Sequence, residues 1–251
     1  MDDVLTIAAF CIVSGILSAI ICAYAAPLGR ATGLVDHPDG KLKLHSGETP
    51  LLGGFAVFPP SLSVSLLYFT HFAPASFMEV ALGAGAAMFA VGIVDDRMGL
   101  SPRARLAALT LIVLAVFAID PLFILRTLRF GLRNWDFGVT LGMLAVPVTA
   151  LMIIGFVNAV NMADGINGQF LGSVTIWSLF VARYLGIDFG APFYIIFCST
   201  MVTLAFNLKG RLFSGSSGAY TASFLIGLGT IAAYRRGGAL SAIEPILWFW
   251  L

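Results

Sequence analysis

Long apolar segments alternate with short polar connections along almost the whole chain. A helix needs about 20 apolar residues to cross the roughly 30 Å hydrocarbon core of a bilayer, and stretches close to this length recur throughout. We therefore predict an all-α polytopic membrane bundle of eight or nine spans. Eight are placed at residues 4–26, 51–72, 77–94, 105–119, 138–157, 168–185, 190–208 and 219–234, and a ninth apolar stretch covers 243–251.

Alternate threading of these spans sorts the connections onto two sides of the membrane. Residues 30–50, 95–104, 158–167 and 209–218 share one side, and 126–136 is predicted to form a short hairpin on the opposite, non-cytoplasmic side. The leader before the first span contains Asp2 and Asp3 but no Lys or Arg, which favours a retained span over a cleaved signal peptide. Arg30, Lys41 and Lys43 follow that span and predict a cytoplasmic position for the first set of connections. Without a repeat or linker, residues 1–251 form one predicted domain.

The composition is typical of a membrane protein and argues against a nucleic-acid partner. Of 251 residues, 59% are hydrophobic and 11% charged, with a mean hydropathy of +0.96, whereas soluble domains carry about 25% charged residues. The net charge of +1 comes without a dense basic run, which argues against a nucleic-acid partner. Cys11, Cys22 and Cys198 lie in apolar segments without CxxC spacing, so we interpret them as packing residues.

The densest polar cluster is NAVNMADGING, from Asn158 to Gly168. Asn158, Asn161 and Asn167 offer amide donors and acceptors, and Asp164 offers a charge. The same residue types are typical of a hydrated turn between two spans. Taken alone, the pattern is compatible with a turn or with a binding site.

Two further clusters lie on the same predicted side. Asp95 and Asp96 are adjacent carboxylates that repel each other unless a cation or basic side chain offsets the repulsion, and hard cations such as Mg²⁺ prefer oxygen ligands. A solvated span end would show the same pattern. In the first loop, Lys43 and His45 are candidates to meet an anionic headgroup or a nucleotide phosphate. No paired carboxylate lies mid-span, which argues against an ion-coupled transporter.

Four motifs in this order resemble those of the polyprenyl-phosphate N-acetylhexosamine-1-phosphate transferases, glycosyltransferase family 4. They are GLVDHPDGK with HSGETPLLGG, then VGIVDDRMGLS, NAVNMADGING and GRLFSGSSGAY. The resemblance covers almost the whole chain. It implies an inner or plasma membrane enzyme that transfers a sugar 1-phosphate from a UDP-N-acetylhexosamine to a polyprenyl phosphate such as undecaprenyl phosphate. It further implies a cytoplasmic active face, Mg²⁺ as cofactor, and release of UMP in cell-wall or surface-polysaccharide biosynthesis.

By position, the resemblance also implies the roles of individual residues. Asp95, Asp96 and Asp164 match catalytic aspartates, and Asp164 matches the one that holds magnesium. The implied substrate-binding residues are Lys43, His45, Thr49, Arg103, Asn158, Asn161 and Asn167. The sugar, the polyprenol length and the oligomeric state stay open, and a homodimer is compatible with this prediction.

The chain departs from the family pattern at two residues and at its end. Ser216 stands where the family carries a second metal-site aspartate, and Asn167 stands where many members carry an aspartate. The chain also stops before the family's last helices and their histidine-containing loop. These departures keep an alternative open, namely a truncated or non-catalytic member that binds polyprenyl-linked substrates without transferring a sugar phosphate.

Overall fold

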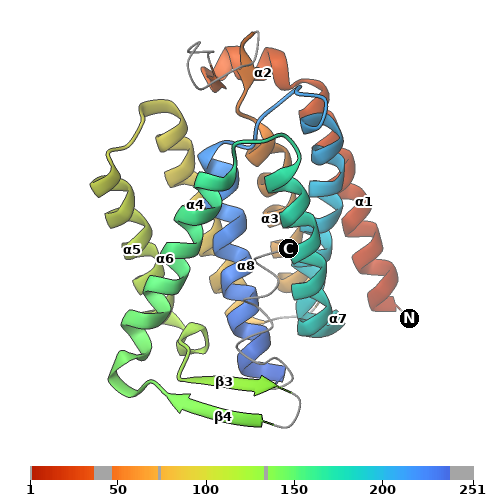
Figure 1. Cartoon of the computed structure of the whole chain (residues 1–251). Helices are drawn as coiled ribbons and strands as arrows, with labels where there is room; N and C mark the ends of the chain where they lie inside the picture. The colour runs from red at the N-terminus through yellow and green to blue at the C-terminus, as the bar shows by residue number, and fades with distance from the viewer. Residues whose placement is uncertain (1, 37–46, 73–74, 133–134, 238–251) are drawn as a thin grey trace.

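The structure, a computed structural model, describes residues 2–36, 47–72, 75–132 and 135–237. The chain forms a bundle of helices with a small strand ribbon at each end (Figure 1). The α-helices are α1 (Asp2–Ala23), α2 (Ala25–Thr32), α3 (Gly53–His71), α4 (Ser76–Met98), α5 (Pro102–Ile119), α6 (Ala145–Ala163), α7 (Gln169–Asn207) and α8 (Gly215–Gly237). The shorter elements are 3₁₀ helices η1 (Pro121–Phe123) and η2 (Gly142–Leu144), and strands β1 (Val35–Asp36), β2 (Thr49–Pro50), β3 (Thr127–Leu132) and β4 (Trp135–Thr140).

Seven helices in the described part of the chain are long and apolar enough to cross a membrane. Two of them are the halves of α7, Gln169–Ile187 and Phe189–Asn207, which join at Gly186 with a non-helical φ of 78° and ψ of 177°. A Cβ atom at Gly190 would lie 2.4 Å from the Ala182 carbonyl oxygen, so the two halves meet closely at this turn. The prediction of two separate spans here is confirmed.

The helix α8 occupies the centre of the bundle, in contact with α3, α4, α6 and α7 (Figure 1). It was predicted as a span, but it is not among the seven described helices that are apolar enough to cross a membrane. Its Ser, Thr and Gly residues suit a helix that faces other helices, because small side chains allow close approach. A Cβ at Gly92 of α4 would lie 2.3 Å from the Ser217 Cα, and one at Gly54 of α3 would lie 2.5 Å from the Gly218 nitrogen.

The antiparallel ribbon of β3 and β4 closes the end of the bundle opposite α2 (Figure 1). Phe130 pairs with Phe137 in register, and their rings stack at 5.0 Å. The Tyr234 hydroxyl of α8 donates to the Thr127 carbonyl and accepts from the Arg129 amide, which fixes the ribbon to the bundle. The predicted hairpin is confirmed, but it extends to Thr140.

Several predicted span ends were wrong, each for a local reason. The fifth span does not begin at residue 138, because the apolar residues up to Thr140 belong to β4. The helices α4 and α6 continue past the predicted ends at residues 94 and 157, since a helix extends into the polar boundary wherever its backbone bonds are satisfied. The first predicted span breaks at Tyr24 into α1 and the short α2. The ninth stretch, 243–251, lies outside the described residues.

Candidate active site

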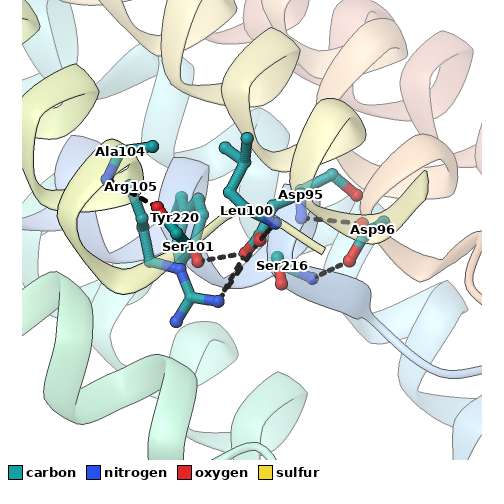
Figure 2. A network of polar contacts seen from close by, with 9 residues as sticks. Asp95, Asp96, Leu100, Ser101, Ala104, Arg105, Ser216 and Tyr220 are labelled. Carbon is teal, nitrogen blue, oxygen red and sulfur yellow. Dashed lines mark hydrogen bonds and ion pairs between the residues drawn. The ribbon is translucent and has the colours of Figure 1, made fainter. Parts of the chain in front are cut away.

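Asp95 lies near the end of α4 within a network of polar contacts (Figure 2). Its Oδ1 accepts hydrogen bonds from the Leu100 amide at 2.8 Å and from Arg105 Nη2 at 3.2 Å. Its Oδ2 accepts from the Tyr220 hydroxyl at 2.5 Å and lies 3.1 Å from the same arginine nitrogen. Asp95 is 5% exposed, and these partners offset the cost of burying its charge. The network ties α4, α5 and α8 together at this end of the bundle.

The neighbouring Asp96 contacts the beginning of α8 (Figure 2). Its Oδ1 accepts from the Ser216 amide at 2.7 Å, and its Oδ2 accepts from the Ser217 amide at 3.0 Å. The first N–H groups of a helix have no partner within the helix and lie at the positive end of its dipole, so a carboxylate is stabilised there. Gly215 has a φ of 71°, and a Cβ at this residue would lie 2.7 Å from Asp96 Oδ2. Glycine therefore lets the carboxylate approach the helix.

Asp164 follows α6 directly as its C-cap residue. Burial raises the pKa of Asp164 from 3.8 to about 7, and repulsion from the nearby Asp96 carboxylate adds to the rise. Two carboxylates from different helices, α4 and α6, thus lie near each other with a repulsion that a cation would relieve.

This donor set fits a magnesium ion that is completed by substrate. Mg²⁺ is commonly bound through one or two carboxylates together with water and substrate phosphates, and Asp96 and Asp164 supply two carboxylates, of which Asp96 lies against the N-terminus of α8. No group of three His, Cys, Asp or Glu side chains that could hold a metal ion occurs among the described residues. Ser216, at the predicted position of a second metal ligand, provides a hydroxyl and gives its amide to Asp96.

The three asparagines of the site occupy different surroundings. Asn158 and Asn161 lie on the last turns of α6, and the Asn158 side-chain amide donates to the Ile154 carbonyl at 2.8 Å. Asn167 is exposed in the connection to α7, and a Cβ at Gly210 would lie 3.6 Å from its Nδ2. The α6–α7 and α7–α8 connections therefore lie side by side at this end of the bundle.

The first-loop residues are only partly described. Thr49 is buried in β2, opposite Asp36 of β1, and the next residue, Pro50, accepts a backbone bond from the Phe213 amide. This contact places the loop beside the α7–α8 connection. Lys43 and His45, both predicted to bind substrate, lie outside the described residues.

Two arginines that follow the paired aspartates in the sequence have different surroundings in the structure. Arg103 is exposed in the first turn of α5, whereas Arg105 forms the ion pair with Asp95. Tyr220 and Asn207 were also missed. A polar residue at the end of an apolar span is a signal that could have revealed Asn207, but Tyr220 gives no such signal within its span.

Together, these features define a polytopic membrane protein with a carboxylate-rich site at one end of its bundle. A family model described as glycosyl transferase family 4 matches residues 78–234, and the chain belongs to this family. The resemblance seen in the sequence motifs is thereby confirmed.

The chain is similar to proteins named undecaprenyl-phosphate alpha-N-acetylglucosaminyl 1-phosphate transferase. The chain is 30% identical to that of Yersinia pestis over 231 residues, which cover 87% of this chain and 60% of the relative. It is 25% identical to that of Escherichia coli K12 over 261 residues, covering 99% of this chain and 68% of the relative. A probable enzyme of nearly the same name from Bacillus subtilis is 23% identical over 245 residues, covering 94% and 66%. The chain thus spans about 60% of the length of the Yersinia relative.

Proposed function

We propose that this protein transfers a sugar 1-phosphate from a UDP-sugar, in particular a UDP-N-acetylhexosamine, to undecaprenyl phosphate and releases UMP. The observation that carries the proposal is a pair of carboxylates at one end of the bundle. Asp96 accepts hydrogen bonds from the first amides of α8, and its charge adds to the rise in the pKa of Asp164. Two carboxylates are a common protein contribution to a magnesium ion whose shell is completed by substrate phosphates. The relatives' names supply the lipid acceptor and the class of sugar.

The chemistry asks the protein mainly for positioning and charge neutralisation. An oxygen of the lipid phosphate attacks the donor phosphorus that carries the sugar, and the bond from this phosphorus to the bridging oxygen breaks as UMP leaves. A phosphate monoester has a second pKa of about 6, so the acceptor is largely a dianion at neutral pH. It therefore needs no obligatory base from Asp95 or Asp96.

The described residues divide these tasks. Asp96 and Asp164 would hold Mg²⁺, which when bound neutralises charge on the donor diphosphate. Asp95 holds α4, α5 and α8 in place through Arg105 and Tyr220, and it acts as a positioning residue. Arg103, exposed at the same end of the bundle, is available to a phosphate group.

The proposed site faces the cytoplasm in the inner or plasma membrane. The basic residues Arg30, Lys41 and Lys43 after the first span support this orientation through the positive-inside rule. Arg30 belongs to α2, whose Thr32 carbonyl accepts a hydrogen bond from Arg97 near the end of α4. The ribbon of β3 and β4 then lies on the non-cytoplasmic side. A homodimer stays a prediction.

The decisive experiment measures UMP release from UDP-N-acetylglucosamine and undecaprenyl phosphate in membranes, with Mg²⁺ or with EDTA. The parent, Ser216→Asp and Asp164→Asn are compared. We expect Mg²⁺-dependent release from the parent and a loss of about 100-fold or more in Asp164→Asn. Activity only in Ser216→Asp would identify Ser216 as an inactivating change. No activity in either the parent or Ser216→Asp, with this donor and with UDP-N-acetylgalactosamine, would refute the proposed transfer.

A further inference from the structure

Asn207, the last residue of α7, is a buried amide that uses both ends of its side chain. Its Oδ1 accepts a hydrogen bond from the Gly168 amide at 2.6 Å, and its Nδ2 donates to the Leu212 carbonyl at 2.9 Å. Asn207 is 5% exposed. Neither partner belongs to a helix body, because Gly168 precedes α7 and Leu212 lies in the connection to α8. The side chain therefore joins two connections.

These two connections carry the opposite halves of the candidate site. Gly168 lies four residues after Asp164, and Leu212 lies four residues before Ser216, whose amide binds Asp96. Gly168 adopts a φ of 86°, and a Cβ there would lie 2.5 Å from Leu208 Cδ2. The α6–α7 connection therefore packs closely against Leu208, the residue that follows Asn207.

We propose that Asn207 is a positioning residue that sets the placement of Asp164 relative to Asp96. This inference rests on the proposed function, because the placement matters for holding a magnesium-bound diphosphate. Asn207 acts through backbone groups and touches neither carboxylate. Without it, the start and the end of α7 would lose their polar link at the site, while the turn at Gly186 would still join the two halves at the opposite end.

A control is needed for the general effect of removing a buried polar side chain from α7. Thr203 lies one turn before Asn207 on the same helix, is fully buried, and accepts a hydrogen bond from Cys22 at 3.8 Å. The Thr203 hydroxyl donates to the Ser199 carbonyl of its own helix at 2.9 Å, and neither of these contacts involves a site connection. Thr203→Val is therefore the matched control for loss of a buried polar group in this helix.

The test compares Asn207→Leu with Thr203→Val in purified full-length chain. In Asn207→Leu we expect kcat to fall at least about tenfold and the half-saturating Mg²⁺ concentration to rise severalfold, as when an outer-shell partner of a metal site is removed. KM for undecaprenyl phosphate should change less than kcat. In Thr203→Val, both kcat and the Mg²⁺ requirement should stay near the parent values. Unchanged kcat and Mg²⁺ requirement in Asn207→Leu would overturn the inference.

A second readout does not depend on activity. Lys209 and Arg211 are exposed in the α7–α8 connection, so trypsin cleavage at these residues, located by mass spectrometry, reports on how firmly the connection is held. We expect cleavage there to be about fivefold or more faster in Asn207→Leu, as for a locally opened segment, and unchanged in Thr203→Val. Equal cleavage in parent and Asn207→Leu would overturn the link, even if the parent releases no UMP and the proposed function fails.

The isosteric Asn207→Asp covers the case in which Asn207→Leu does not fold. It keeps an acceptor for the Gly168 amide and loses the donor to the Leu212 carbonyl. We expect the same changes in kcat and cleavage, measured below the unfolding temperature of the variant, which should be lower than the parent's because a buried carboxylate would face the Leu212 carbonyl. A kcat equal to the parent's in this variant would contradict the role assigned to the Leu212 bond.

Discussion

Replacing Asp164 with Asn should stabilise the metal-free protein at high pH. Asp164 is half-buried near Asp96, and the pKa of its carboxyl rises from 3.8 to about 7. The folded protein therefore favours the protonated form more than the unfolded chain does. The stability that comes from this preference is fully present below pH 4 and is lost as the pH rises through about 7. Asparagine mimics the protonated form at every pH.

The size of the effect follows from the pKa change. A rise of about 3 units at about 1.4 kcal/mol per unit sets a ceiling of about 4 kcal/mol. Partial exposure of Asp164 lets water screen the charge, so we expect about 1 to 2 kcal/mol. For a chain of this size, that corresponds to a rise of roughly 2 to 8 °C in unfolding temperature.

The assay is thermal unfolding in detergent with EDTA at pH 5 and pH 8.5. Asp164→Asn should unfold at a higher temperature than the parent at pH 8.5, and the difference should shrink at pH 5. Adding Mg²⁺ at pH 8.5 should raise the unfolding temperature of the parent more than that of the variant. A variant less stable than the parent at pH 8.5 in EDTA would refute the claim that burial and the nearby Asp96 charge disfavour the charged form of Asp164.

Five further substitutions test the contacts around the site. Gly92→Ala places a methyl group against the backbone of α8 and should lower the free energy of unfolding by about 2 kcal/mol or more. Gly83→Ala on the same helix meets nothing within 4 Å and should be neutral or slightly stabilising. Unfolding temperatures of the two variants test this difference. Tyr220→Phe removes one donor to a buried carboxylate and should cost about 1.5 to 3 kcal/mol in chemical unfolding; no change would show that the bond is not formed. Arg105→Gln should destabilise the fold, while Arg103→Gln should leave the unfolding temperature unchanged and raise KM for the UDP-sugar.

The sequence predicts the overall arrangement well because the bilayer imposes a simple rule on segment length. An apolar stretch of about 20 residues is long enough to span the membrane as a helix and is therefore predicted to do so. Once the spans alternate, the connections that carry Asp95, Asp96 and Asp164 must share one side. The two halves of α7 and the hairpin at the end of the bundle opposite α2 follow from the same reasoning.

The choice of partners within the site could not be predicted in this way. Arg103 and Arg105 look equivalent in the sequence, and the way α5 packs against α4 decides which of them reaches Asp95. The contact of Asp96 with the amides of Ser216 and Ser217 depends on where α8 begins, and the predicted start at residue 219 hid that contact. Helix ends are set by local backbone bonding, on which hydropathy carries little information.

The central position of α8 has a consequence for how the protein enters its membrane. This helix is less apolar than the seven other candidate spans, and nearly all residues from Ser217 to Ala233 are buried against its neighbours. On its own it would partition weakly from the translocation channel into lipid, because its Ser, Thr and Gly residues make it less apolar than the other spans. It follows the other helices in the chain, so they are already available to receive it during synthesis. Membrane integration of α8 should therefore be cooperative, and mutations in α3, α4 or α6 that spare its own sequence should still impair it.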